Sequence, residues 1–258
     1  MRFADLLEQP PIWRESLAGL EASRLVRDPV FRGESIADAG GQPVLLVPGF
    51  LAGDGSLGLM TGWLRRTGHH TSRAGIRANV DCSEASVRRL LGRLERFAER
   101  SGERVAIVGQ SRGGSLARVL AMRRPDLVSG IVTLGSPVVD PLAVHPLVRL
   151  QVEWVSALGS LGAPGLFRSA CLAGDCCEPF RSDSSAPFPA GVEFVAVYSR
   201  SDGIVDWRAC LDPAAERVEV ASSHVGMAAN ASVYRVIAAA LEGFRAHAAP
   251  SWVHAQAA

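Results

Sequence analysis

The sequence Gly109-Gln-Ser-Arg-Gly113 places a serine between two glycines, directly after the apolar run 105–108 and directly before an amphipathic helical pattern. A strand that turns sharply into a helix at such a motif leaves the serine hydroxyl exposed. Glycines suit the flanking positions because a side chain there would crowd the turn. The N-terminus of the following helix adds partial positive charge and free backbone N–H groups. Ser111 is therefore a candidate nucleophile, provided that a base accepts its proton.

A histidine and an aspartate follow later strand-like segments and complete a possible proton relay. His224 comes shortly after the segment 217–221. We predict that it takes the proton of Ser111 and later protonates the leaving group. Asp202 follows the apolar segment 192–198. We predict that its carboxylate orients the imidazole ring and stabilises the imidazolium ion that forms.

Other residues remain open for these two roles. Asp140 follows the preceding strand-like segment and is the second choice as the acid, and Asp206 is the third. Asp202 has the alternative role of a turn residue beside Gly203. Five further histidines compete with His224 but do not lie just after the last strand, and they are His69, His70, His145, His247 and His254.

The order serine, acid, histidine, with each residue after a strand, resembles the α/β-hydrolase fold. Four segments make the chain most similar to bacterial lipases and esterases within that superfamily: Pro48–Phe50, Gly109–Gly113, Ser201–Val205 and Ser223–Gly226. The resemblance covers roughly residues 43–243. It implies an α/β fold with a mainly parallel central sheet, helices on its flanks and a cap insertion.

The resemblance also implies an activity and the groups that support it. The chain is expected to be a serine esterase or lipase that works through an acyl-enzyme intermediate, without a cofactor or a metal. The backbone N–H groups of Phe50 and Arg112 are the candidate oxyanion hole. Two positions depart from the usual pattern. Pro48-Gly49 replaces the common His-Gly, and Arg112 brings a charged side chain to the residue after the nucleophile.

Two other classes of function remain open at this point. A thioesterase or an acyltransferase would use the same relay, and a non-catalytic ligand-binding protein would keep the fold without turnover. In each case the expected partner is a small molecule, an ester or a lipid in the first instance. The sequence leaves the oligomeric state open.

Composition excludes several mechanisms and partners. The chain has 258 residues and a net charge of +1, which argues against nucleic acid or an anionic membrane as partner. No lysine occurs among its 27 basic residues, so Schiff-base and serine–lysine chemistry are excluded. Residues 1–10 lack the apolar run of a signal peptide, and no apolar stretch is long enough to span a membrane. We expect a cytoplasmic location, or secretion if a signal peptide was removed.

Composition along the chain suggests how it is organised. Residues 1–42 are expected to form a helical N-terminal arm, and 43–137 together with 191–245 the α/β-hydrolase core. The insertion 138–190 interrupts the alternation of strands and helices and is expected to form a cap or lid above the site. Residues 246–258 are expected to form a loose tail.

Two finer predictions concern helices. Asp81 and Glu84 have the spacing of a reciprocal capping box before the helical pattern that ends at Gly102. In the insertion, apolar side chains are expected either to line an acyl channel or simply to pack the cap onto the core. They are Leu147, Leu150, Trp154, Leu158, Leu166 and Phe167.

The five cysteines allow more than one state. Cys171, Cys176 and Cys177 cluster in the insertion, Cys210 follows the candidate acid, and Cys82 stands apart in the sequence. In an oxidising compartment, Cys171 or Cys177 could bridge to Cys210, and otherwise the thiols stay reduced. A zinc site is the less favoured interpretation, because the cluster lacks two spaced pairs of ligands.

Overall fold

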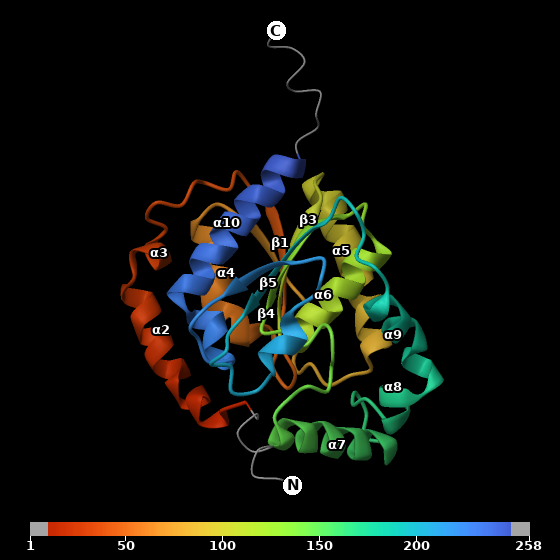
Figure 1. Cartoon of the computed structure of the whole chain (residues 1–258). Coiled ribbons are helices and arrows are strands. Elements are labelled where there is room, and N and C mark those ends of the chain that lie inside the picture. The colour runs from red at the N-terminus through yellow and green to blue at the C-terminus, as the bar shows by residue number, and fades with distance from the viewer. Residues whose placement is uncertain (1–9, 249–258) are drawn as a thin grey trace.

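The computed structural model describes residues 10–248, which are built around one six-stranded sheet (Figure 1). The strand order is β2-β1-β3-β4-β5-β6, and every neighbouring pair is parallel. The strands are β1 (Pro43–Val47), β2 (His70–Arg73), β3 (Val105–Gln110), β4 (Val128–Leu134), β5 (Glu193–Tyr198) and β6 (Glu216–Glu219). The predicted α/β class with a mainly parallel sheet is confirmed.

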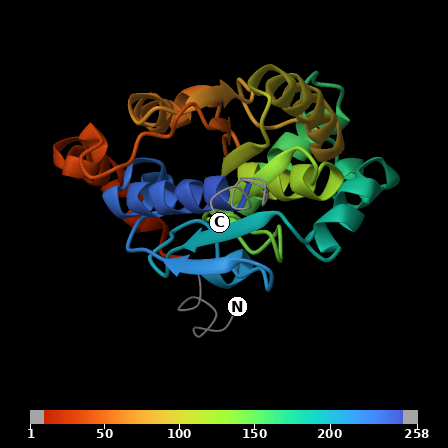
Figure 2. The same ribbon diagram turned by 90° about the horizontal axis from the view of Figure 1, so that it is seen from above.

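Helices cover both faces of the sheet, and strand residues alternate between two apolar layers. Val44 and Leu46 of β1 belong to one layer, whereas Leu45 and Val47 belong to the other. Every residue of β1, β3 and β4 is buried, as expected for central strands that are covered on both sides. Figures 1 and 2 show α4 (Gly58–Arg66) and α10 (Ala231–Ala248) on one face, with α5 (Ser83–Ser101) and α6 (Arg112–Arg123) on the other.

The segment before β1 contains η1 (Ile12–Leu17), α2 (Ala18–Arg27) and α3 (Pro29–Arg32). The Asp28 side chain caps α3 by accepting a hydrogen bond from the Val30 amide at 2.9 Å. At the other end of the chain, α10 continues through residues 246–248, which we expected in the tail. Residues 1–9 and 249–258, and His254 with them, lie outside the described range.

The insertion between β4 and β5 forms several short helices, namely α7 (Pro146–Ser160), α8 (Ser169–Ala173), η3 (Asp175–Cys177) and α9 (Glu178–Ser185). Figure 1 shows α7 below the carboxyl ends of the strands, with α9 beside α6 and α8 close to α7. Within residues 10–248, no helix is long and apolar enough to cross a membrane.

A buried arginine, Arg118, connects α6 to the insertion. The Arg118 guanidinium lies 2.8 Å from an Asp212 carboxylate oxygen, and both side chains are only 6% exposed. It also donates hydrogen bonds to the carbonyl oxygens of Asp183 and Ala186, at 3.1 and 2.9 Å. These contacts satisfy the buried charge and join three segments that are far apart in the sequence.

Replacing Arg118 with methionine is expected to lower the free energy of unfolding by about 3–5 kcal/mol, because the Asp212 carboxylate stays buried without its partner. The control is Arg124→Met, which removes solvent-accessible ion pairs with Glu95 and Asp126 and should cost about 1 kcal/mol or less. Urea unfolding of both variants checks the difference. Equal losses in the two variants would contradict it.

Two sequence predictions about α5 have different outcomes. Gly102 ends the helix with a φ of 71°, as predicted. The capping box is wrong, because the helix begins at Ser83, and Cys82 precedes it without a side-chain cap. Asp81 accepts a hydrogen bond from the adjacent Cys82 amide, and Glu84 instead binds the Arg123 guanidinium through both carboxylate oxygens. The bidentate ion pair with Arg123 occupies the Glu84 carboxylate, which therefore does not accept a hydrogen bond from the N-terminal backbone of α5.

The cysteines also differ from expectation. Neither bridge to Cys210 is present, because all five thiols are free and Cys210 is buried in a small apolar cluster with Val205 and Ala209. Cys82 stands apart in the sequence, yet its Sγ atom lies 3.3 Å from the Sγ atom of Cys177.

Candidate active site

Ser111 is the single residue between β3 and α6, and its backbone has the strained geometry of a sharp turn. Its φ is 52° and its ψ is −125°, a conformation that residues other than glycine rarely adopt. The Ser111 amide donates a 2.8 Å hydrogen bond to the carbonyl of Leu134 at the end of β4, which helps to hold the turn. The strand-turn-helix context predicted for the motif is present.

Three glycines allow this turn to pack closely. A Cβ atom at Gly109 would lie 2.6 Å from the backbone of Gly113, and one at Gly113 would lie 2.2 Å from the carbonyl oxygen of Val47. A Cβ atom at Gly49 would lie 3.2 Å from Ser111 Cβ. The loop after β1 therefore lies directly beside the serine.

The structure pairs His224 with Asp202. His224 Nδ1 lies 2.7 Å from Asp202 Oδ2, and the two residues are 5% and 3% exposed. The other carboxylate oxygen, Oδ1, accepts hydrogen bonds from the amides of Ile204 and Val205, both at 2.8 Å. These bonds fix the carboxylate so that Oδ2 faces the imidazole ring.

The alternative acids are engaged elsewhere. Asp140 is exposed and accepts a hydrogen bond from the Leu142 amide. Asp206 caps the short helix η4 (Trp207–Cys210) by accepting from the Arg208 amide. Of the three aspartates, the structure brings only Asp202 to the histidine.

A cavity of about 310 Å³, called here the Ser111 cavity, contains both Ser111 and His224 in its wall. Segments from the carboxyl ends of five strands contribute to it: 49–52, 110–112, 137–138, 204 and 224–225. Ligand sites of open parallel sheets are commonly found at this edge. The wall is mainly apolar, and the insertion adds Val148, Gln151, Val152, Phe167, Leu172 and Phe180.

Neither role expected for the apolar side chains of the insertion, lining an acyl channel or packing the cap onto the core, holds for most of the six residues. Phe167 does line the Ser111 cavity. The remaining five do not line it. Four of them lie on α7, which turns Val148 and Val152 toward the cavity and a neighbouring face toward solvent. The side chains exposed on that face are Leu147, Leu150, Trp154 and Leu158. Leu166 is half-buried outside the cavity.

The Arg112 side chain does not bring a free charge into the cavity. Its guanidinium donates hydrogen bonds to the Asp81 carbonyl and to Ser83 Oγ, and it lies over the Phe167 ring with its central carbon 5.5 Å from the centroid. Burial lowers its pKa to about 10, so the group keeps its charge at neutral pH. The Arg112 cation is therefore part of the wall of the Ser111 cavity, where it contacts Asp81, Ser83 and Phe167.

The two candidate oxyanion donors come from different elements, α6 and the loop after β1. Arg112 is the first residue of α6, where a backbone N–H has no acceptor within the helix. Phe50 follows Gly49 and forms an isolated bridge with Asn79, whose side-chain amide donates to the Pro48 carbonyl at 2.8 Å. These contacts fix the loop, and the role of the two amides remains a prediction.

Two carboxylates from the N-terminal segment hold the loops of the candidate relay, and the sequence analysis missed both. Glu15 accepts hydrogen bonds from the amides of Gly203, His224 and Val225, at 2.8 to 2.9 Å. Glu21 accepts from the Ser223 amide at 2.8 Å and from the side chains of Ser222 and Asn230. No local motif marks them, because their partners are far away in the sequence.

Gly135 and Gln110 also lie against His224. Gly135 follows β4 with a φ of 54°, and a Cβ atom there would lie 2.9 Å from Asp202 Oδ2 and 3.0 Å from His224 Nδ1. Gln110 donates a 3.2 Å hydrogen bond from its side chain to the His224 carbonyl. Neither role was predicted from the sequence.

The surroundings of His224 act on its pKa in opposite directions. Burial lowers the pKa, whereas the Asp202 carboxylate, by charge and hydrogen bonding, and the Glu15 carboxylate raise it. The net direction is upward from the ordinary value. A base works only when neutral, so a raised pKa moves the acid limb of a pH–rate profile toward higher pH.

Replacing Glu15 with glutamine is therefore expected to shift the acid limb of kcat/KM toward lower pH, because one of the charges that raise the His224 pKa is lost. The amide oxygen can still accept from the Gly203 and His224 amides, whereas the NH₂ group takes the place of the oxygen that accepts from the Val225 amide. The matched control is Glu21→Gln, which changes the neighbouring loop contacts but not a charge that acts on His224. An identical acid limb in wild type and Glu15→Gln would contradict the electrostatic role.

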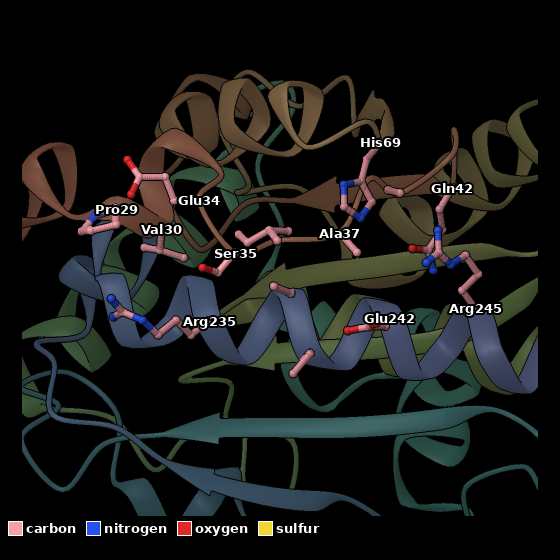
Figure 3. A pocket seen from close by; sticks show the side chains of 14 residues that line it. Pro29, Val30, Glu34, Ser35, Ala37, Gln42, His69, Arg235, Glu242 and Arg245 are labelled. Atoms are coloured by element: carbon pink, nitrogen blue, oxygen red, sulfur yellow. The ribbon is translucent and has the colours of Figure 1, made fainter.

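A second cavity of about 370 Å³ lies between the segment after α3 and α10 (Figure 3). Its charged side chains, including Glu34, Arg235 and Arg245, are spread along its length and do not converge on a hydroxyl group. Its histidine, His69, uses Nδ1 for contacts with Thr67 Oγ1 and the Leu64 carbonyl, both at 3.1 Å. The Ser111 cavity is therefore the better candidate site.

Comparisons with known proteins support the architecture. No family model matches the sequence. The mature lipase BlEst2 of Bacillus licheniformis superposes with a TM-score of 0.59 at 14% identity, over 80% of this chain and 94% of that chain. A soluble variant of monoglyceride lipase from Saccharomyces cerevisiae gives 0.56 at 12% identity, over 85% and 90%.

Tomato methylketone synthase I, solved in complex with 2-tridecanone, gives a TM-score of 0.55 at 11% identity, over 79% of this chain and 99% of that chain. At such low identities the likeness establishes the fold and leaves the activity to be argued from the site. The strand order, the turn at Ser111 and these superpositions agree. The chain has the α/β-hydrolase fold.

Proposed function

We propose that this protein is a serine hydrolase that cleaves carboxylic esters through an acyl-enzyme intermediate. The observation that carries the proposal is the 2.7 Å contact between His224 Nδ1 and Asp202, in the wall of the cavity that Ser111 also lines. With a proton on Nδ1 donated to the carboxylate, the other ring nitrogen, Nε2, is left as the base.

The steps follow from these positions. Ser111 Oγ attacks the ester carbonyl carbon while His224 takes its proton, and the carbonyl oxygen becomes an oxyanion. The amides of Phe50 and Arg112 stabilise this charge by hydrogen bonding. His224 then protonates the leaving alcohol, which departs and leaves an acyl-serine. Water, activated by the same histidine, releases the acid and restores the serine.

The cavity favours a neutral ester with an apolar acyl group. Its two arginines are both engaged, Arg112 with Asp81 and Ser83, and Arg118 with Asp212. No free cation is therefore offered to a charged acyl chain by these residues, while the rest of the wall is mainly apolar. The proposal predicts higher kcat/KM for esters with longer apolar acyl chains than for acetate esters.

The test is a covalent one. A fluorophosphonate probe should label the folded protein, and peptide mass spectrometry should place the label on Ser111. A series of p-nitrophenyl esters, with thioesters and acceptor alcohols assayed in parallel, then separates ester hydrolysis from thioester hydrolysis and acyl transfer. A folded protein that is neither labelled nor active on any of these substrates would indicate a binding protein instead.

A further inference from the structure

Four cysteines from two distant parts of the chain meet beside the Ser111 cavity. Their Sγ atoms, those of Cys82, Cys171, Cys176 and Cys177, all lie within 4.8 Å of one another. The distances are 3.3 Å between Cys82 and Cys177, 3.4 Å between Cys171 and Cys176, and 3.9 Å between Cys176 and Cys177. Cys82 comes from the start of α5, and the other three come from α8 and η3.

This geometry is close to that of a tetrahedral metal site. Zinc binds thiolates at about 2.3 Å, which places the four sulfur atoms of a tetrahedral site about 3.8 Å apart. The separations in the cluster bracket this value, so only small side-chain movements are needed. A set of four sulfur ligands selects soft or borderline metals and excludes magnesium and calcium.

The surroundings offset the negative charge that four thiolates would carry. The Arg168 amide donates a 3.4 Å hydrogen bond to Cys171 Sγ. Cys82 occupies the N-cap position of α5, at the positive end of a helix of 19 residues. The guanidinium of Arg112 is held by Asp81 and Ser83, the two neighbours of Cys82 in the sequence. Such contacts typically orient and stabilise the ligands of a metal.

The segment that carries three of the cysteines buries few side chains, and Ser169 hydrogen-bonds it to Ser156 and Ser160 of α7. The helix α8 has five residues and none of them is buried, and η3 has three residues of which only Cys177 is buried. Helices this short are not stable alone. A metal that links them to α5 would stabilise the segment further, because metal-binding energy becomes folding energy.

We propose that Cys82, Cys171, Cys176 and Cys177 hold a structural Zn²⁺ ion that fastens the α8–η3 segment to the start of α5. The sequence disfavours zinc because the cluster in the insertion lacks a second spaced pair of ligands. The structure supplies the fourth ligand from Cys82, on a different element. The proposal does not depend on the proposed esterase activity, because the metal is not a participant in that chemistry.

Two disulfides, Cys82 with Cys177 and Cys171 with Cys176, are the competing state of the same cluster. Two disulfides would require the sulfur atoms to be close within each pair, but not between the pairs. Instead, each sulfur atom lies within reach of all three others, and Cys176 is close to Cys177 as well as to Cys171. This mutual proximity favours one shared ligand over two separate bonds.

The experiment measures metal content of the full-length protein, produced with zinc in the medium and purified without a chelator. Elemental mass spectrometry should find about one zinc ion per chain in the wild type, and less than about 0.2 in Cys82→Ser and Cys177→Ser. The matched control is Cys210→Ser, which removes the one described cysteine outside the cluster and should keep its zinc.

A second measurement does not need the variants to fold. Wild-type protein in which Co²⁺ replaces zinc should show thiolate-to-cobalt charge-transfer absorption and the intense visible bands of a tetrahedral site. Chelation should then increase the number of thiols that react with a thiol reagent and speed hydrogen exchange in residues 169–177, while the central strands are unchanged.

Two results would overturn the proposal. One is a wild-type chain without zinc or cobalt binding, whose intact mass without reductant is lower by four hydrogens. The other is metal that is bound but retained in full by both cluster variants, which would place it elsewhere.

Discussion

The variant Ser111→Ala is expected to hydrolyse esters with a kcat roughly 10⁴- to 10⁶-fold below that of the wild type. Without the hydroxyl no acyl-enzyme forms, and only attack by water remains, helped by the oxyanion donors and by substrate binding. KM should change much less than kcat, because the apolar wall of the Ser111 cavity is intact. Steady-state kinetics with a p-nitrophenyl ester measures both.

The same substitution should leave the fold intact. Among the described residues, Ser111 Oγ makes no hydrogen bond, so its removal should change the free energy of unfolding by less than about 0.5 kcal/mol. Ser101→Ala is the control, since it removes hydrogen bonds to the Phe97 and Ala98 carbonyls far from the cavity and should keep full activity. An alanine variant at 111 within tenfold of the wild type would assign hydrolysis to another residue.

The parts of the fold that could be predicted are those with a local signature. The central strands were visible because a strand covered on both faces is a nearly continuous apolar run, as in 44–47 and 105–108, and in 128–134 with Ser129 and Thr133 as its polar members. The edge was less clear. The edge strand β2 spans only His70–Arg73, and its polar residues form no apolar run that would mark a strand in the sequence.

The turn at Ser111 was also local, since glycine, serine and glycine at fixed spacing impose it. The contacts that orient the candidate relay are not local. Glu15 and Glu21 reach the loops at 202–204 and 222–225 from the start of the chain, and Cys82 meets its partners from another element. A single sequence carries no signal for such pairs, because ordinary helix-surface residues look the same.

The insertion shows a third kind of limit. A helical period reveals that α7 has an apolar side, but both Val148 and Leu150 are apolar, and the sequence does not say which of them faces the core. The structure turns Val148 inward and leaves Leu150 and Trp154 exposed. Orientation depends on what the helix packs against, which is decided by the rest of the fold.

The second large effect is expected for Asp202→Asn, which should lower kcat by roughly 10⁴-fold. Asparagine can keep the hydrogen bonds that Oδ1 accepts from the Ile204 and Val205 amides. Its NH₂ group then faces His224 Nδ1 and donates to it. The ring proton is moved to Nε2, so the histidine no longer presents a lone pair to the Ser111 hydroxyl.

The pH dependence of that variant distinguishes this mechanism from a loss of structure. Asp202 raises the pKa of His224, so its neutral replacement should move the acid limb of the residual activity toward lower pH. Asp140→Asn and Asp206→Asn are matched controls that make the same change at the alternative acids, and both should stay near wild-type activity and keep the wild-type acid limb. A tenfold or smaller loss in Asp202→Asn, or a large loss in Asp140→Asn, would place the orienting carboxylate elsewhere. The contact at 2.7 Å favours Asp202, because a hydrogen bond to the buried ring fixes both its tautomer and its direction.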